Sequence, residues 1–128
     1  MKLPPYADLL GLSVDLEPGL PPLLTMPFGE GVTGRPGFLH GGAIGGLLEV
    51  AAIAALQQAL DAEGGGRVKP IGVTIDFMRG GREKLTRARG LVTRLGTRVA
   101  NVDALAWQDA EDRPIARARM NYLVMRGG

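Results

Sequence analysis

The sequence of 128 residues contains no cysteine, one histidine and only six aromatic residues. The absence of cysteine excludes disulfides, thiolate metal sites and thiol nucleophiles. A single histidine argues against a zinc site built within one chain. The few aromatic residues argue against a nucleic-acid surface on which bases stack between basic side chains. We therefore expect no metal and no nucleic-acid partner.

We also expect no signal peptide, since prolines stand at positions 4 and 5, where an apolar run would be needed. Residues 41–60 form a run of membrane-spanning length. It contains a central glutamate, two glutamines and four glycines, which argue against insertion. The length suits one core. We expect residues 1–128 to form a single cytoplasmic domain without a membrane segment.

Charge is distributed unevenly along the chain. Residues 1–66 carry seven acidic and two basic side chains, whereas residues 67–128 carry thirteen basic and six acidic ones. The first half is therefore net negative and the second half net positive. The second half suits an anionic partner, although arginines on the solvent face of strands would give the same composition.

Residues 40–60, HGGAIGGLLEVAAIAALQQAL, predict one long helix, which begins at His40 and has Glu49 at its middle. The other side chains are apolar or absent, apart from two glutamines near the end. A helix that is apolar on all sides is expected to be buried on all sides. A buried carboxylate is costly unless it is paired or used. Glu49 is therefore the first candidate for a functional residue.

The spacing of these two side chains predicts how a site is assembled. His40 and Glu49 are nine residues apart, which corresponds to about 900° of rotation and roughly 13 Å along a helix. They cannot form a dyad within one chain, so a site that uses both needs two subunits, as in a symmetric homodimer. Gly41 and Gly42 lack side chains, and the first N–H groups of a helix can bind a carbonyl oxygen that gains negative charge.

The rest of the sequence predicts mainly strands. Before the central helix, a short helix is expected at 4–10 and strands at 12–17 and 23–28. Residues 61–69 are expected to be a flexible connection, and the strands that follow it are expected at 71–77, 83–95, 99–107 and 115–125. In 99–107 and 115–125, apolar residues alternate along the sequence, so each strand is expected to present one apolar face, which includes Val102 and Tyr122 respectively. Consecutive strands with short turns favour an antiparallel sheet. The predicted class is α+β, with a curved antiparallel β-sheet wrapped around the long central helix.

These features resemble the hotdog-fold thioesterases, in particular the PaaI-like and 4-hydroxybenzoyl-CoA thioesterase group. The resemblance covers nearly the whole chain. Its motifs are G-x-x-H-G-G at residues 37–42, the acid nine residues after the histidine, and the segment Phe-Met-Arg-Gly at 77–80. It implies an enzyme that hydrolyses an aryl- or fatty-acyl-CoA to the free acid and CoA, without a further cofactor.

The resemblance also implies residue roles. Glu49 would be the general base or nucleophile, and Gly41 of the opposite subunit would donate its N–H to the thioester oxygen. Gly42 would lie beside it, and His40 would support the start of the helix. CoA would lie against basic strand ends and turns at the interface of a homodimer, with a dimer of dimers expected. The candidates for CoA contacts are Arg79, Arg82, Thr97 and Arg98.

Three positions depart from the family pattern. Gly34 stands where Asn or Gln is usual, Ile53 where some members have Thr, and Pro70 where some have Ser or Thr. This reduced set of polar residues leaves a non-catalytic acyl-CoA-binding protein as an alternative. A hydratase of related fold is disfavoured, because such enzymes need an acid and a histidine close together in one chain.

Overall fold

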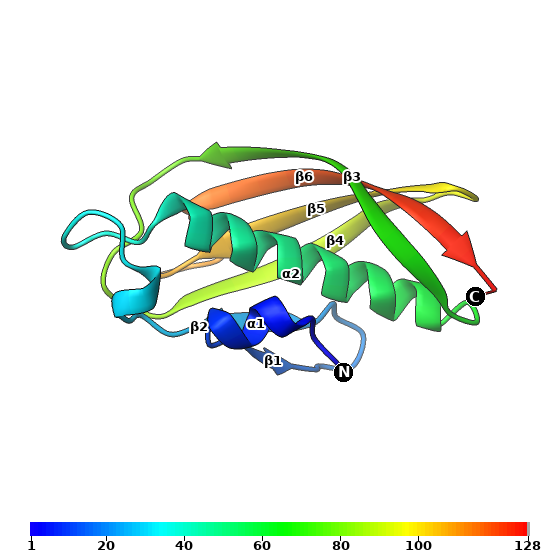
Figure 1. Cartoon of the computed structure of the whole chain (residues 1–128), viewed down its shortest axis with the longest axis horizontal. Helices are drawn as coiled ribbons and strands as arrows, with labels where there is room; N and C mark the ends of the chain where they lie inside the picture. The colour runs from blue at the N-terminus through cyan, green and yellow to red at the C-terminus, as the bar shows by residue number, and fades with distance from the viewer. Residues whose placement is uncertain (128) are drawn as a thin grey trace.

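The computed structural model describes residues 1–127 and contains one sheet and one long helix (Figure 1). The elements are α1 (Pro5–Leu9), β1 (Ser13–Asp15), β2 (Leu23–Met26), the 3-10 helix η1 (Glu30–Val32), α2 (Gly41–Asp61), β3 (Gly66–Phe77), β4 (Thr86–Leu95), β5 (Val99–Trp107) and β6 (Ala116–Arg126). The sheet has six antiparallel strands in the order β1-β2-β4-β5-β6-β3. The predicted α+β class with a long central helix is confirmed.

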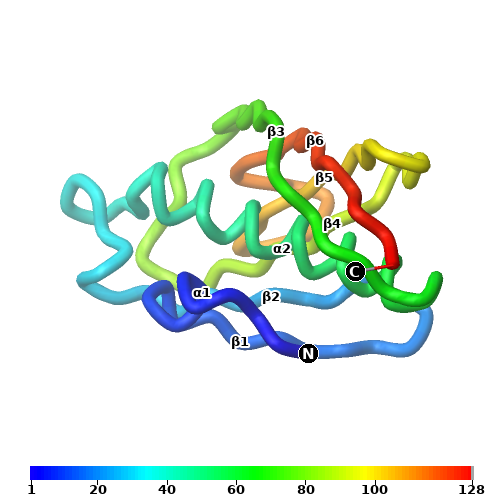
Figure 2. Tube along the Cα trace, turned by 45° about the vertical axis from the view of Figure 1, so that its right-hand side comes forward, coloured from blue at the N-terminus to red at the C-terminus, as the bar shows by residue number. Residues whose placement is uncertain are grey.

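The sheet curves around α2, as Figure 2 shows, with β1 and β2 on one side of the helix and β3 and β6 on the other. Strands β5 and β6 turn the predicted alternating positions toward the helix. Their buried side chains are mostly small: Ala100, Val102, Ala104, Ala106, Ala116, Ala118, Met120, Tyr122 and Val124. Small side chains allow the helix and the sheet to approach closely.

The closest approach is at Gly90 on β4. A Cβ atom added there would lie 2.6 Å from the carbonyl oxygen of Ala51 and 2.9 Å from the Cβ atom of Ala55, both on α2. No side chain fits in this space, so the helix rests directly on the backbone of the strand. Gly90 therefore sets the distance between α2 and the sheet.

Strand β3 is longer than the sequence predicts. It begins at Gly66 and pairs with β6 as far as Phe77, so the last four residues of the expected connection at 61–69 belong to the strand. Pro70 lies within it, next to a register shift between Pro70 and Gly72. This proline is tolerated because β3 is an edge strand and the ladder is irregular at that point. Strand β4 is shorter than predicted and begins at Thr86 rather than at residue 83.

The expectation that α2 is buried on all sides is wrong for the single chain. Every fourth residue along one line of the helix is exposed or half-buried, and Glu49 is among the exposed ones. This stripe consists of Gly41, Gly45, Glu49, Ile53, Gln57 and Asp61. The rest of the protein encloses most of the helix and leaves this stripe uncovered. The helix has the length and hydropathy of a membrane span, but 67% of its most apolar window is buried within the protein.

Beside this stripe, β3 presents apolar side chains to solvent. The exposed fractions of Ile71, Val73 and Phe77 are 61%, 58% and 57%. Phe77 reaches the start of α2, since a Cβ atom added at Gly41 would lie 3.5 Å from its ring. Together, the α2 stripe and the β3 edge form one apolar surface that the single chain leaves uncovered.

Candidate active site

The start of α2 is held by the side chain of His40. This residue is the N-cap, with φ −70° and ψ 134°, and its Nδ1 accepts a hydrogen bond of 2.8 Å from the N–H of Gly42. The carbonyl oxygen of His40 accepts from the N–H groups of Ala43 and Ile44. Within residues 1–127, no acceptor takes the N–H of Gly41. Of the two candidate glycines, only Gly41 therefore offers a free donor.

The loop before the helix fixes this arrangement. Thr33 bridges Leu39 in an antiparallel manner, and the N–H of His40 donates to the carbonyl oxygen of Val32 at 2.8 Å. Gly34 packs against the backbone of His40, since an added Cβ atom would lie 3.0 Å from its Cα. In this chain a side chain at position 34 would push against the helix start. This contact accounts for glycine at a position where the family usually has Asn or Gln.

A hollow of about 320 Å³ lies beside Gly41. Its lining residues are Leu39, Gly41, Ile44, Phe77, Met78, Arg79, Gly80 and Gly81. The guanidinium of Arg79 donates to the carbonyl oxygen of Pro114 at 2.6 Å, which holds this side chain at the rim. The free N–H of Gly41 and a fixed cation thus share one hollow.

Next to this hollow, the ring of Phe38 lies between two guanidinium groups. The Cζ atom of Arg35 is 4.0 Å from the ring centroid, and that of Arg82 is 4.2 Å from it. Both distances suit cation–π contact. Gly80 makes room for the ring, because an added Cβ atom would lie 2.8 Å from Phe38. Arg82 is therefore held close to the helix start.

The turn that carries Arg82 is fixed by the buried side chain of Gln108. Its Oε1 accepts from the N–H of Arg82 at 2.9 Å, and its Nε2 donates to the carbonyl oxygen of Arg82 at 3.0 Å. The same Nε2 lies within hydrogen-bond distance of Lys84 and Thr86. The sequence analysis did not identify Gln108, Phe38 or Arg35. The position of Phe38 within the G-x-x-H-G-G motif was the one available signal.

Glu49 lies at a different hollow of about 110 Å³, between α2 and strands β3 and β6. Its other lining residues are Pro70, Ile71, Gly72, Val73, Met120 and Tyr122. It shares no lining residue with the hollow at Gly41. Gly41 and Glu49 are eight positions apart on α2, which is about 12 Å along the helix axis. The expected separation of the acid from the helix start within one chain is thus observed.

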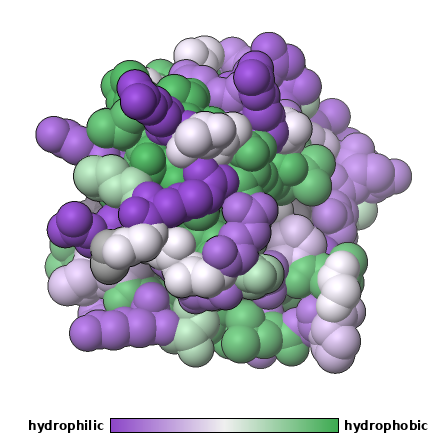
Figure 3. All heavy atoms as spheres, turned by 90° about the vertical axis from the view of Figure 1, so that its right-hand side faces the viewer, coloured by the Kyte–Doolittle hydropathy of each residue, from purple (hydrophilic) through white to green (hydrophobic). Residues whose placement is uncertain are grey.

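The four candidate CoA contacts form two pairs at opposite ends of the molecule. Arg79 and Arg82 lie near the start of α2, whereas Thr97 and Arg98 lie on the β4–β5 hairpin at the other end (Figure 1). The hairpin borders a hollow of about 390 Å³, and Arg126 donates to the carbonyl oxygens of Gly96 and Thr97. Figure 3 views this end, where hydrophilic side chains surround apolar ones.

Ion pairs to acidic side chains hold some of the other arginines. Arg89 pairs with Glu17 and Glu111, and Arg117 lies 3.7 Å from Asp76. Among residues 1–127, no acidic side chain lies within ion-pair distance of Arg79, Arg82 or Arg98. These three guanidinium groups are thus available to an anionic ligand. In the same part of the chain, no group of three His, Asp or Glu side chains is placed to hold a metal ion.

Comparison with known proteins identifies the family. The sequence profile of the Thioesterase superfamily matches residues 36–115, more than half of the chain. The chain belongs to the thioesterase superfamily. The resemblance inferred from the sequence motifs is thereby confirmed, and the protein is a thioester hydrolase. A search of curated proteins finds no match.

Solved structures share this fold. A protein from Chromobacterium violaceum is 31% identical, covering 97% of this thioesterase and 85% of that chain, with a TM-score of 0.76. A phenylacetic acid degradation-related protein from Ralstonia eutropha is 22% identical, covering 96% and 92%, with a TM-score of 0.80. A protein from Bacillus halodurans, solved with CoA, is 18% identical, covering 96% and 80%, with a TM-score of 0.79. The last two comparisons show the fold.

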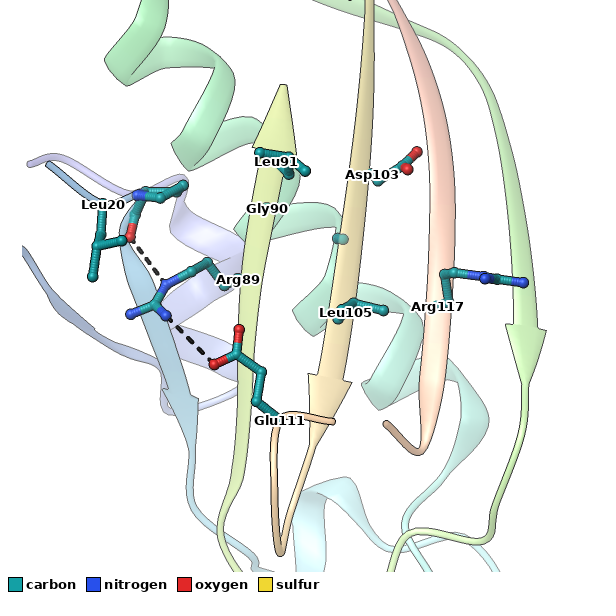
Figure 4. A pocket seen from close by; sticks show the side chains of 10 residues that line it. Leu20, Arg89, Gly90, Leu91, Asp103, Leu105, Glu111 and Arg117 are labelled. Atoms are coloured by element: carbon teal, nitrogen blue, oxygen red, sulfur yellow. Dashed lines mark hydrogen bonds and ion pairs between the residues drawn. The ribbon is translucent and has the colours of Figure 1, made fainter. Parts of the chain in front are cut away.

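The thioesterase has a further hollow of about 400 Å³ on the sheet face turned away from α2 (Figure 4). Leu91, Leu105 and Arg117 project from neighbouring strands along it, and the guanidinium of Arg89 lies between Leu20 and Glu111. Neither Gly41 nor Glu49 lines this hollow. It is a feature of the outer surface of the sheet and lies apart from both candidate catalytic groups.

Proposed function

We propose that the protein is an acyl-CoA thioesterase whose active site combines Gly41 of one subunit with Glu49 of the opposite subunit. The observation that carries this proposal is the free N–H of Gly41, which is left over when His40 takes the N–H of Gly42. An N–H at the start of a 21-residue helix is suited to bind the oxygen of a thioester as it becomes negative.

The chemistry then follows from a carboxylate on the other side of the thioester. Glu49 would take a proton from water, whose oxygen adds to the carbonyl carbon, or would add to that carbon directly. In the first case, collapse of the tetrahedral intermediate breaks the C–S bond, and the proton held by Glu49 passes to the departing thiolate. In the second case, departure of the CoA thiolate breaks the C–S bond and leaves a mixed anhydride between the acyl group and Glu49. Water then hydrolyses this anhydride to the free acid and the Glu49 carboxylate, and the released proton neutralises the thiolate.

The homodimer is supported by the uncovered apolar surface on β3 and α2. An unpaired edge strand with exposed Ile71, Val73 and Phe77 is a template for pairing with a second copy. Antiparallel pairing of two β3 strands about a two-fold axis would run the two α2 helices in opposite directions. The Gly41 end of one helix would then approach the exposed Glu49 stripe of the other.

The same symmetry supports CoA as the leaving group. The two-fold axis would place the β4–β5 hairpin of one subunit near the start of α2 in the other. Arg79 and Arg82 would then face Thr97 and Arg98 of the opposite subunit across one groove, where guanidinium groups without ion pairs would meet the phosphates of CoA. The CoA complex of the Bacillus halodurans protein, which shares this fold, supports this choice.

For a dimer of dimers, we propose the outer face of the sheet. Leu91 is 60% exposed there, beside a hollow that also carries Asp103 and Arg117. A face with apolar centres and charges of both signs can pair with a copy of itself.

The test is thiol release from a panel of aryl- and fatty-acyl-CoA substrates by the wild-type protein and by Glu49→Gln. We expect turnover by the wild type and a loss of about 10²- to 10⁴-fold in the variant, the range for removal of a general base. Full activity in Glu49→Gln would disprove the assignment. Saturable CoA binding without turnover of any panel member would overturn the proposed reaction.

Subunit mixing tests the shared site. Gly41→Pro removes the N–H group and Glu49→Gln removes the carboxylate, so each homodimer should be inactive. Random mixed dimers would contain one site with both groups intact, which should restore about one quarter of the wild-type activity in an equal mixture. If both groups acted within one chain, no mixture would recover activity.

A further inference from the structure

The hollow beside Glu49 contains one other polar side chain, that of Tyr122. This residue lies on β6 and is 1% exposed, so it is part of the core and also lines the hollow. The remaining lining residues are apolar or glycine: Pro70, Ile71, Gly72, Val73 and Met120. Glu49 and Tyr122 are the titratable groups that line it.

The hydroxyl of Tyr122 has a weak partner. It lies 3.1 Å from the Sδ atom of Met120, and within residues 1–127 no other hydrogen bond of this hydroxyl is present. A thioether is a weak acceptor, whereas a carboxylate is a strong one. The hydroxyl hydrogen can turn about the C–O bond. Because Glu49 is exposed, its side chain can move toward this hydroxyl, and the weak bond to sulfur can then be exchanged for a stronger one.

The charge of Glu49 acts on this hydroxyl. The pKa of Tyr122 is raised, mainly because the ring is buried and additionally because the Glu49 carboxylate is near. This effect of Glu49 agrees with the position of both residues at one hollow.

We propose that Tyr122 is a positioning residue for Glu49. When a second subunit covers the α2 stripe, the side chain of Glu49 turns toward the hydroxyl, which exchanges the sulfur of Met120 for the carboxylate and holds that carboxylate in a fixed orientation. This inference rests on the proposed catalytic role of Glu49. Gly34, Ile53 and Pro70 stand at three positions where relatives have polar side chains. In the proposed site, the hydroxyl of Tyr122 on β6 supplies a polar contact in place of those side chains.

The kinetic test compares Tyr122→Phe with two other variants. A hydrogen bond to a charged group corresponds to roughly 10- to 100-fold in rate, so Tyr122→Phe should lower kcat by this factor and leave KM nearly unchanged. Tyr6→Phe removes the other tyrosine hydroxyl of the chain and should leave both constants unchanged. Met120→Leu removes the sulfur but keeps the hydroxyl, and should retain at least several-fold more activity than Tyr122→Phe. Equal losses in the Met120 and Tyr122 variants would overturn the proposal.

A second measurement does not depend on turnover. In protein labelled with 3-fluorotyrosine, Tyr6→Phe and Tyr122→Phe identify the two fluorine resonances. Removal of the carboxylate in Glu49→Gln should move the Tyr122 resonance relative to its position in the wild type, whereas the Tyr6 resonance should stay in place. A Tyr122 resonance unaffected by Glu49→Gln would disprove the contact. A movement that depends on Glu49, in a protein that hydrolyses no thioester, would instead refute the proposed function while leaving the contact established.

Discussion

Nδ1 of His40 accepts the N–H of Gly42 at 2.8 Å, and this bond determines which of two adjacent glycines has a free donor. Because Nδ1 is the acceptor, the proton of the neutral ring is on Nε2. The histidine therefore acts as an N-cap through its ring, a task that short polar side chains usually perform. Gly41, one residue earlier, keeps its N–H pointing out of the helix start with no partner among residues 1–127.

The first prediction follows from this bond and concerns Gly41→Pro. Proline is favoured at the first helical position, and the extended conformation of His40 (φ −70°, ψ 134°) is the one that a following proline requires. The variant should therefore keep its thermal midpoint while losing about 10²- to 10³-fold in kcat, as when an oxyanion donor is removed. Thiol-release kinetics and thermal denaturation measure the two effects.

The matched control is Gly41→Ala, which keeps the N–H. Its Cβ atom would lie 3.5 Å from the Phe77 ring, an ordinary contact distance. Its kcat should thus remain much closer to that of the wild type. A Gly41→Pro protein that is folded and as active as Gly41→Ala would show that this N–H does not stabilise the oxyanion.

Much of the fold could be predicted because the spacing of apolar residues along the sequence indicates the helices and strands. Alternation in β5 and β6 predicted the buried faces correctly, including Val102 and Tyr122. The separation of His40 from Glu49 followed from helix geometry alone. The motif at residues 37–42 supplied the family, which the match to residues 36–115 confirms.

The errors have a common physical cause. The features that could not be predicted depend on contacts between residues that are distant in sequence. Strand β3 extends back to Gly66 because β6 continues to Arg126, although the glycines at 64–66 predicted a connection. Glu49 is exposed because it lies on the stripe of α2 that the rest of the chain leaves uncovered. The contacts of Phe38 with Arg35 and Arg82, and of Gln108 with the Arg82 turn, arise from loops that meet only in the folded chain.

A second prediction concerns the contact between α2 and β4. Gly90→Ala would place a Cβ atom 2.6 Å from the carbonyl oxygen of Ala51, so the helix must move away from the sheet. Overpacking of this kind typically costs about 1–3 kcal/mol of unfolding free energy. Gly29→Ala is the control, since nothing lies within 4 Å of its added Cβ atom. Urea denaturation should show a lower midpoint for Gly90→Ala alone, and equal midpoints would contradict the close packing.

Alkaline stability provides a third prediction. Because burial and the nearby Glu49 raise the pKa of Tyr122 above its ordinary value of 10.0, folding favours the neutral hydroxyl. The contribution of this group to stability is complete below the ordinary value and is lost as the pH rises above it toward the raised value. The wild type should therefore lose more unfolding free energy than Tyr122→Phe between about pH 8 and pH 11. Urea titrations at the two pH values measure this difference, and parallel losses would contradict the shift.

The last prediction separates the two proposed interfaces by placing a charge on each. Val73→Asp puts a carboxylate on the exposed β3 edge, where burial against a second copy would require it to lose water. This variant should be monomeric and inactive, although each chain keeps its Gly41 and Glu49. Leu91→Asp alters the outer face of the sheet and should reduce a tetramer to an active dimer. Light scattering and thiol release distinguish these outcomes. An active Val73→Asp monomer would show that one chain is sufficient for catalysis.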